Sequence, residues 1–250
     1  MTDRPRVAVF RPPGPRTERA EAALDDLGAI AVADPLVVPV PTGALPRRDA
    51  DVVVLTSSTA ASILSDAGWA AGEASVAAIG PRTADALRAV GIEVDVVPER
   101  YDSKGLVEAL ADDVDGLQVE VARSDHGSPT LLRGLEGAGA EVHETVLYRL
   151  ELPDDAGRSV DAILAGTVDA LAFTSSLTVD RFLSLAAERT DRATIEAALG
   201  SVVVGAIGEP TARTLRDRGI TPDVVAPSAT FEALAEAVVD ALAGTDTRHV

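Results

Sequence analysis

The sequence contains a long internal repeat, and this feature limits the possible folds more than any other. Residues 76–97, VAAIGPRTADALRAVGIEVDVV, return at 204–225 as VGAIGEPTARTLRDRGITPDVV. The copies stay about 128 residues apart, without gaps, over about thirty-five positions, and about two in five positions are identical. A repeat of this length predicts two similar domains rather than a solenoid. Two similar lobes usually face each other across a cleft, where small molecules bind.

The fold class follows from the alternation of two kinds of segment. Short runs of β-branched residues alternate with Ala-rich helical stretches, a pattern typical of a parallel sheet covered by helices. The chain of 250 residues is long enough for two such α/β domains. Strands are predicted at Val7–Arg11, Val52–Thr56, Val76–Ile79, Val94–Val97, Val119–Arg123, Asp169–Thr174, Val202–Ile207 and Asp223–Val225.

Two further strand-like segments, 36–40 and 145–150, lie outside the repeat. If they pair as a two-stranded antiparallel ribbon, the chain crosses between the lobes twice. One lobe then combines residues 1–36 with 151–250, and the other spans 40–146. The predicted fold is therefore two α/β lobes with parallel sheets, joined by this ribbon.

The composition excludes several classes of partner. The formal net charge is −18, from 40 acidic and 22 basic side chains, as in proteins of halophiles, which need salt to screen self-repulsion. Nucleic-acid and membrane partners are not expected, because both need a basic face. The chain has no cysteine, no apolar run of membrane-spanning length and no recognisable signal peptide. These features favour a cytoplasmic location.

The histidines do not predict a metal site. His126, His143 and His249 are scattered, and no pair has the spacing of metal ligands. Ser124, Asp125 and His126 are adjacent in sequence, but adjacency does not make a catalytic triad, which is a spatial arrangement. We therefore expect no resident metal.

Hydroxyl residues follow one strand of each predicted lobe. Thr56, Ser57 and Ser58 end one strand, and their counterparts are Thr174, Ser175 and Ser176. Small hydroxyl residues that lead into a helix leave backbone N–H groups free to hold a carboxylate or a phosphate. Ordinary helix capping is the alternative. Two copies at matching places make the two explanations about equal.

The repeat also places a Gly-x-x-Thr turn after one strand of each lobe. The turns are Gly80 to Thr83 and Gly208 to Thr211. Glycine lets a ligand approach the backbone, and the threonine hydroxyl lies in the first helical turn. The glycine spacing matches neither a dinucleotide fingerprint nor a P-loop. A plain strand-to-helix turn is the alternative.

Two arginines end strands, and a tyrosine lies in the second crossing segment. Arg11 ends one strand, and Arg123, followed by Ser124, ends another. In so acidic a chain they are candidate anchors for an anionic ligand, with surface charge balance as the alternative. Tyr148 is one of two tyrosines. It is a candidate to point into a cleft, with core packing as the alternative.

Taken together, these segments resemble the uroporphyrinogen-III synthase family, in its haloarchaeal type. The resemblance covers nearly the whole chain, and it depends on the order of moderately specific motifs. These are Arg11-Pro12, the two Thr-Ser-Ser segments, the two Ile-Gly-x-x-Thr-Ala turns, Val146–Arg149 and residues 223–234.

The resemblance implies two flavodoxin-like lobes and a specific reaction. The substrate would be hydroxymethylbilane, a linear tetrapyrrole with eight carboxylates. The enzyme would expel its hydroxyl as water, invert ring D and close the macrocycle as uroporphyrinogen III, a step of tetrapyrrole biosynthesis that needs no cofactor. The resemblance further suggests a monomer that receives its substrate from the enzyme forming hydroxymethylbilane.

The resemblance also suggests roles for individual residues. Tyr148 matches the family tyrosine proposed to assist departure of the hydroxyl. Thr83 and Thr211 match threonines expected to touch substrate carboxylates, and Ser57 and Ser175 match the serines at the ends of the two strands. Substrate-binding residues predicted overall are Arg11, Ser57, Ser58, Thr83, Arg123, Ser124, Ser175, Ser176 and Thr211.

One departure from the family pattern and two rival functions remain open. Glu209 stands where the family commonly has proline, which would place an acid beside an anion site. The main rival is a non-catalytic two-lobe small-molecule binder or regulatory protein on the same fold. A phosphate-handling or nucleotide-sugar transferase is less favoured, because it should show a glycine-rich loop and a clear acid or base.

Overall fold

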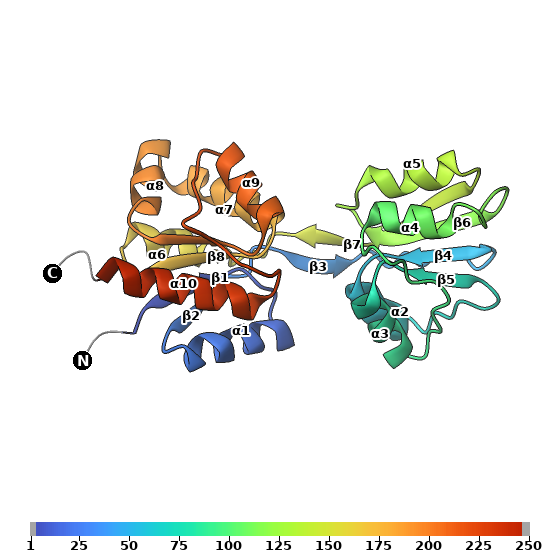
Figure 1. The fold of residues 1–250 in the computed structure, drawn as a ribbon, viewed down its shortest axis with the longest axis horizontal. Coiled ribbons are helices and arrows are strands. Elements are labelled where there is room, and N and C mark those ends of the chain that lie inside the picture. Colours follow the sequence, from blue (N-terminus) through green and yellow to red (C-terminus); the bar gives the residue numbers. More distant parts are fainter. Residues whose placement is uncertain (1–3, 247–250) are drawn as a thin grey trace. The chain divides into compact units, whose positions relative to one another are not determined.

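The computed structural model describes residues 4–246 and divides into two compact α/β units (Figure 1). Unit 1 combines the chain up to Val38 with the chain from Glu151 onward, and unit 2 spans Pro39–Leu150. None of the helices between residues 4 and 246 is long and apolar enough to cross a membrane.

Unit 1 is built on a five-stranded sheet in the order β10-β9-β8-β1-β2, and each neighbouring pair is parallel. Its strands are β1 (Arg6–Val9), β2 (Ile30–Ala33), β8 (Ala170–Phe173), β9 (Val203–Ala206) and β10 (Val224–Val225). Its helices are α1 (Pro15–Asp26), α6 (Arg158–Leu164), α7 (Ser176–Arg189), α8 (Arg192–Leu199), α9 (Glu209–Asp217) and α10 (Phe231–Asp246).

Helices cover both faces of the unit 1 sheet, which explains why its central strands are apolar on both sides. Helices α6 to α9 pack on one face and α1 and α10 on the other (Figure 1). On the first face, Phe10, Phe173 and Phe182 form a fully buried aromatic cluster whose ring centroids lie 4.7–5.8 Å apart. The remaining contacts come from aliphatic side chains at helical spacing.

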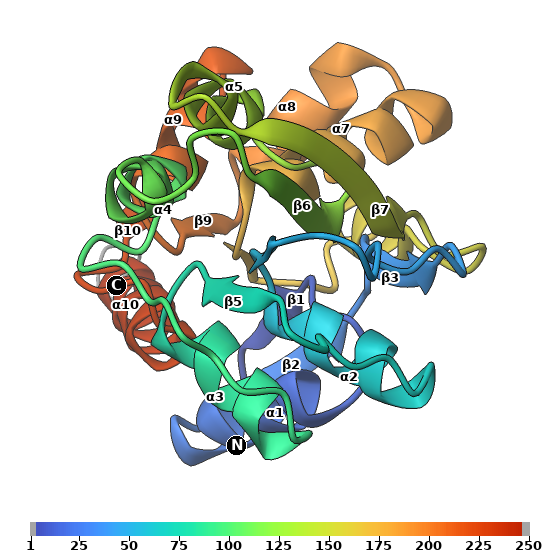
Figure 2. The ribbon, with the colours of Figure 1, turned by 90° about the vertical axis from the view of Figure 1, so that its right-hand side faces the viewer.

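Unit 2 repeats this architecture in the order β3-β7-β6-β4-β5. Its strands are β3 (Val38–Pro41), β4 (Val52–Leu55), β5 (Ser75–Ala78), β6 (Gln118–Ser124) and β7 (Glu141–Glu151). Its helices are α2 (Ser58–Asp66), α3 (Pro81–Ala89), α4 (Ser103–Leu110) and α5 (Pro129–Gly137). Helices α2 and α3 pack on one face and α4 and α5 on the other (Figure 2).

The prediction of two lobes with parallel sheets is confirmed, and three local expectations change. Residues 94–97 form only one bridge, between Ala77 and Val96, and no regular strand. Strand β2 was not predicted, because its alanines weaken the β-branched pattern. Strand β7 begins at Glu141, because its first half pairs in parallel with β6 before it reaches the predicted crossing segment.

The two crossing segments are neighbours. Strand β3 lies next to β7 in the sheet order, and the Thr42 N–H donates to the Leu147 carbonyl oxygen (2.9 Å). The antiparallel direction of this pair stays a prediction.

A buried aspartate fastens unit 1 at the points where the chain leaves and re-enters it. Asp34 is fully buried just after β2, and its carboxylate accepts the backbone N–H groups of Gly157 (3.0 Å) and Ser159 (2.9 Å). The Ser159 hydroxyl donates to the same carboxylate. Asp34 therefore serves as the N-terminal cap of α6, about 125 residues away in sequence.

Candidate functional site

The candidate site residues lie at the carboxyl edge of each parallel sheet. In unit 2, strands β4, β5 and β6 lead into α2, α3 and α5, and in unit 1 strands β8 and β9 lead into α7 and α9. Because parallel strands end at the same edge, these helix N-termini gather there, and their free N–H groups favour anions.

The predicted serines cap the helices that follow them. The Ser57 hydroxyl accepts from the Thr59 N–H (3.1 Å) at α2, and the Ser175 hydroxyl accepts from the Thr178 N–H (3.2 Å) at α7. Ser176 donates to the Pro210 carbonyl (3.3 Å) and accepts from the Thr214 hydroxyl (2.8 Å), which ties α7 to α9. The capping alternative therefore accounts for Ser57 and Ser175. Ser58, the first residue of α2, and Ser124, the last residue of β6, are both half-buried.

The two repeated threonine turns have the same geometry and unused hydroxyl groups. Thr83 is 5% exposed and Thr211 3%, each three residues after the glycine that begins the turn. The N–H groups of Ala84 and Ala212 donate back to the Gly80 and Gly208 carbonyls, both at 3.0 Å. Among residues 4–246 neither threonine hydroxyl has a hydrogen-bond partner. Neither oxygen is a fully buried atom without a partner, so each hydroxyl can be reached and is available to a ligand.

A third turn of the same sequence serves as an internal reference. Residues 14–17 repeat the Gly-Pro-Arg-Thr of residues 80–83 at the start of α1. Here the Thr17 hydroxyl donates to the Pro12 carbonyl (2.6 Å). The motif alone does not leave the hydroxyl free; the loop in front of the helix decides.

Glu209 is paired with an arginine of its own helix. Its carboxylate accepts from the Arg216 guanidinium (2.7 Å) seven residues along α9, with both side chains about half exposed. At the equivalent turn of unit 2, Arg82 is exposed and has no ion-pair partner among the described residues. The two turns therefore differ in local charge.

The two predicted arginine anchors have different surroundings. Arg123 is only 4% exposed, pairs with Glu144 (2.7 Å) and donates to the Ser128 carbonyl (2.5 Å). These bonds favour a structural role in holding the loop after β6 over the predicted ligand contact. The Arg11 guanidinium lies 4.7 Å above the ring centroid of Phe231, the first residue of α10. This cation–π contact holds Arg11 at the carboxyl edge of unit 1.

Tyr148 is largely buried in unit 2. It is 5% exposed and belongs to the apolar cluster between the sheet and α2 and α3. Its hydroxyl has no hydrogen-bond partner within residues 4–246. The packing alternative accounts for the ring, and the hydroxyl group remains available to a ligand.

Tyr101, which sequence reasoning missed, lies against one of the threonine turns. It is 63% exposed, and a Cβ atom at Gly80 would lie 3.2 Å from its Cβ and Cγ atoms. Glycine at position 80 therefore lets the tyrosine side chain pack on the start of α3. The repeat could have revealed it, because Ala229 stands at the matching position of unit 1.

An aspartate–histidine pair lies in the loop after β6. Nδ1 of His126 and Oδ1 of Asp125 are 2.8 Å apart, and the same oxygen accepts the Leu150 N–H (3.0 Å). Partial burial raises the pKa of Asp125, but the hydrogen bonds from His126 and the Leu150 N–H lower it more, so its pKa lies below the ordinary value. The sequence analysis rejected a catalytic triad of Ser124, Asp125 and His126. The structure shows that Asp125 and His126 form a hydrogen-bonded pair.

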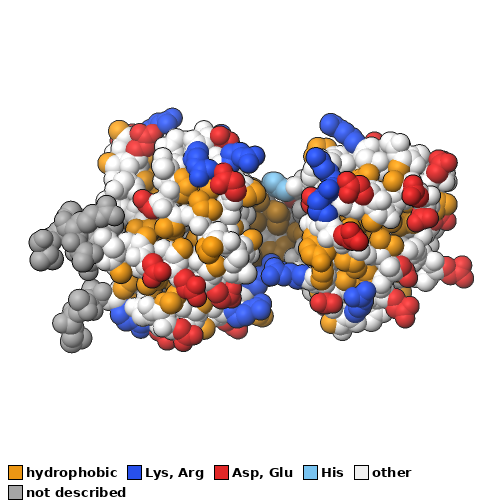
Figure 3. All heavy atoms as spheres, in the orientation of Figure 1, with side chains coloured by type: hydrophobic (Ala, Val, Ile, Leu, Met, Phe, Trp, Pro, Cys, Tyr) orange, Lys and Arg blue, Asp and Glu red, His pale blue; other side chains and the backbone are white. Residues whose placement is uncertain are grey.

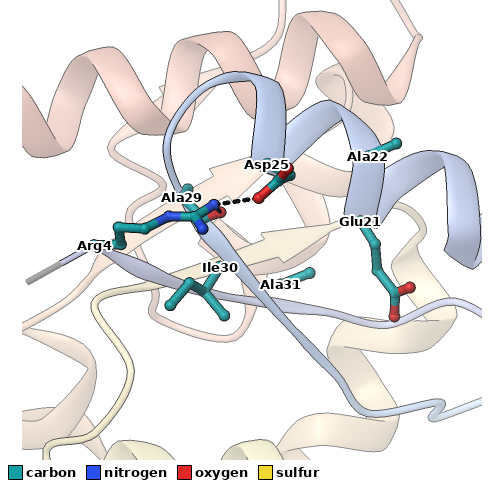
Figure 4. A pocket seen from close by; sticks show the side chains of 7 residues that line it. All are labelled: Arg4, Glu21, Ala22, Asp25, Ala29, Ile30 and Ala31. Carbon is teal, nitrogen blue, oxygen red and sulfur yellow. Dashed lines mark hydrogen bonds and ion pairs between the residues drawn. The ribbon is translucent and has the colours of Figure 1, made fainter.

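Two surface hollows lie away from these residues. The one in unit 1, about 380 Å³, lies beside the second half of α1 and the start of β2, and its Arg4 is paired with Asp25 at 2.5 Å (Figure 4). The one in unit 2, about 880 Å³, lies between the ends of α2 and α3 and the start of β5. Both belong to the amino edge of their sheet.

No group of three or more His, Asp and Glu side chains within the described residues could hold a metal ion. His249 lies outside the described residues. Asp and Glu side chains are scattered over the visible face of both units (Figure 3). This distribution fits a solvated acidic surface rather than a cation site.

Comparison with known proteins decides the family. The sequence matches the family described as uroporphyrinogen-III synthase HemD over residues 18–236. The chain belongs to the uroporphyrinogen-III synthase family. A protein of Methanothermobacter thermautotrophicus named "Putative uroporphyrinogen-III synthase" is 40% identical over 180 residues, 68% of this chain and 70% of that protein. An Archaeoglobus fulgidus protein of the same name is 33% identical over 176 residues, 70% of this chain and 73% of that protein.

Solved structures show the same fold. A mutant uroporphyrinogen III synthase of the bacterium Thermus thermophilus superposes with a TM-score of 0.65 at 23% identity, covering 96% of this chain and 99% of that one. Family membership favours a cyclising lyase over the non-catalytic two-lobe binder. The carboxyl-edge residues of each unit are the natural place to look for its chemistry.

Proposed function

We propose that the chain converts hydroxymethylbilane into uroporphyrinogen III, with loss of water and inversion of ring D. Family membership over residues 18–236 carries this proposal. The two threonine turns support it, because each offers a helix N-terminus and a threonine hydroxyl without a partner among residues 4–246. A substrate with eight carboxylates needs several such anion sites.

The reaction depends mainly on positioning. Without an enzyme, the bilane loses its hydroxyl and closes to the symmetric type I isomer. The protein therefore has to hold the chain so that the substituted position of ring D reacts first. Thr83 and Thr211 would each donate a hydrogen bond to a substrate carboxylate, and the N–H groups of α3 and α9 would add to it. This arrangement lets a strongly acidic protein bind an anion without many lysines.

Unit 2 would contribute more than carboxylate binding. Arg82 adds a positive charge to its turn, and the exposed ring of Tyr101 offers a flat surface on which a pyrrole can stack. Tyr148 would direct its hydroxyl toward the departing group of the substrate as a hydrogen-bond donor. Its ring is held in an apolar cluster, so we assign the hydroxyl an orienting role.

We further propose that the protein acts in the cytoplasm as a monomer and takes its substrate from the enzyme that forms hydroxymethylbilane. The charge of −18 supports a monomer, because like-charged copies repel one another. Sedimentation of the purified protein across salt concentrations tests this part, and a stable dimer would contradict it.

A coupled assay tests the activity. Freshly made hydroxymethylbilane is added with and without the folded protein in concentrated potassium chloride, and the oxidised products are separated by isomer. We expect mostly type III product with the protein and type I without it. Type I product at the uncatalysed rate, from protein shown to be folded by circular dichroism, would favour the two-lobe binder.

A further inference from the structure

We propose that His126, oriented by Asp125, is the general acid that protonates the departing hydroxyl of the substrate. This inference rests on the proposed function and adds to it a catalytic residue. The loop of residues 124–128 lies at the carboxyl edge of unit 2, between β6 and α5. It is the same edge at which the Gly80 turn lies, because β5 and β6 both run parallel to β4.

The loop that carries the pair is firmly held. Arg123, buried beneath it, donates to the Ser128 carbonyl (2.5 Å) and is itself fixed by Glu144. The Asp125 N–H donates to the Tyr148 carbonyl (3.3 Å), and the Leu150 N–H donates to the Asp125 carboxylate (3.0 Å). Asp125 is therefore bound to β7 at two residues, Tyr148 and Leu150. A pair fastened in this way is preorganised, as proton transfer requires.

The charge of Asp125 and the hydrogens on the His126 ring suit a proton donor. The Asp125 carboxylate keeps its charge down to low pH, so Nδ1 of His126 carries the hydrogen that it accepts. In a protonated imidazole Nε2 carries the second hydrogen, and the bond from Nδ1 to Asp125 fixes the ring that presents it. The His126 side chain is 42% exposed, so its ring can be reached by a ligand.

The proton balance of the step is simple. The bond between the hydroxymethyl carbon and its oxygen breaks, and the electron pair leaves with the oxygen. The proton on Nε2 of His126 joins that oxygen, and water departs. The pyrrole nitrogen stabilises the cation that remains on the carbon. When ring closure is complete, the neutral imidazole can take the proton that the rearomatising ring releases, which restores the starting state.

Besides Asp125, the elements packed against this loop contribute Tyr148 and Arg149 of β7 and Arg123 of β6, whose guanidinium is already bound by Glu144. A second histidine pair provides a matched control. Nδ1 of His143 lies 2.6 Å from Glu120, and the register places this pair in the middle of the β6–β7 ladder, away from the carboxyl edge.

The test compares four variants in the isomer assay, each first shown to be folded by circular dichroism. For His126→Gln we expect a fall in kcat of about tenfold or more, the range typical of a lost general acid. Wild-type kcat should decline as the pH rises through the neutral range, because the protonated imidazole is lost, and this decline should be absent in His126→Gln. For His143→Gln we expect the rate and the pH profile of the wild type.

Asp125→Asn separates charge from geometry. Asparagine keeps an Oδ1 acceptor for both the imidazole and the Leu150 N–H, but it removes the negative charge. We expect its decline in kcat to begin at a lower pH than in the wild type, with the maximum rate reduced less than in His126→Gln. Added imidazole should partly restore the activity of His126→Ala, which a purely structural role would not allow.

The outcomes are distinguishable. If the wild type makes type III product and His126→Gln matches its rate and pH profile within about twofold, the inference is wrong and the proposed function stands. If the folded wild type makes only type I product at the uncatalysed rate, the proposed function fails, and the inference fails with it.

Discussion

The two units share a repeated sequence, yet their buried carboxylates and their threonine turns have different surroundings. Unit 1 gives the buried carboxylate of Asp34 three donors, whereas unit 2 leaves Oε1 of the buried Glu120 without a partner among the described residues. At the threonine turns, unit 1 adds a glutamate bound to Arg216, whereas unit 2 adds Arg82 and Tyr101. The repeated sequence gives both units the same turn, whereas the charged and aromatic groups around each turn differ.

The largest effect is expected from the buried carboxylates. Asp34→Asn would turn an amide N–H₂ toward groups that are themselves donors, so we expect a loss of about 3 kcal/mol or more in the free energy of unfolding. Glu120→Gln should cost less than about 1 kcal/mol, because it removes a buried charge that is only half satisfied. Chemical denaturation measures both.

A single fluorophore helps to locate these effects. Trp69, the only tryptophan of the chain, is buried in unit 2, so its fluorescence reports unit 2 while circular dichroism reports both units. For Asp34→Asn the dichroism midpoint should move at least as far as the fluorescence midpoint. Equal stabilities of Asp34→Asn and the wild type would contradict the fastening role.

The next largest effect is expected at the threonine turns. Valine has the shape of threonine without its hydroxyl, so Thr83→Val tests the hydrogen bond alone. Loss of one bond to a carboxylate is worth about 1.5–3 kcal/mol, which is roughly a tenfold to hundredfold fall in kcat/KM. Thr211→Val should cost less, because Arg82 strengthens only the turn of unit 2. The isomer assay with both variants checks the order, and Thr17→Val serves as a control for folding.

Tyr148→Phe removes one hydroxyl from unit 2, where unit 1 has no equivalent residue. Because that hydroxyl has no partner within residues 4–246, we expect wild-type stability together with a several-fold fall in kcat. Steady-state kinetics and thermal unfolding give the two readouts. An unchanged kcat would remove Tyr148 from the mechanism.

Tyr101→Ala should act on substrate binding more than on turnover. Loss of a stacking ring is worth about 0.5–1.5 kcal/mol, so KM should rise about two- to tenfold with little change in kcat. Tyr101→Phe keeps the ring and should behave like the wild type. If Tyr101→Phe and Tyr101→Ala raise KM equally, the tyrosine hydroxyl rather than the ring binds the substrate.

The smallest effect is expected from Glu209→Gln. Removing an acid from the first turn of α9 should lower KM by no more than about threefold, because the charge is exposed and already paired with Arg216. Arg216→Gln is the matched change and should raise KM, because it releases the glutamate toward the turn. A large effect of Glu209→Gln would show that this side chain reaches the substrate.

The sequence alone determined the two α/β units, the parallel strands and the placing of hydroxyl-bearing turns at strand ends. These features are local, because a strand or a helix start depends on residues within a few positions. Thus Ser57, Ser175 and the threonine turns could be found by reading the repeat. The length of β7 could not, because its first half is a strand only through pairing with β6.

Only the tertiary structure decided what individual side chains do. The buried Arg123 is paired with Glu144, 21 residues away, and Asp34 finds its partners more than 120 residues away. Asp125 and His126 are adjacent in sequence, but their geometry depends on strand β7. The turn at Thr17 repeats the sequence at Thr83, yet its hydroxyl is used by Pro12. A repeated sequence specifies a backbone, whereas the reach of a side chain depends on the neighbours that folding brings to it.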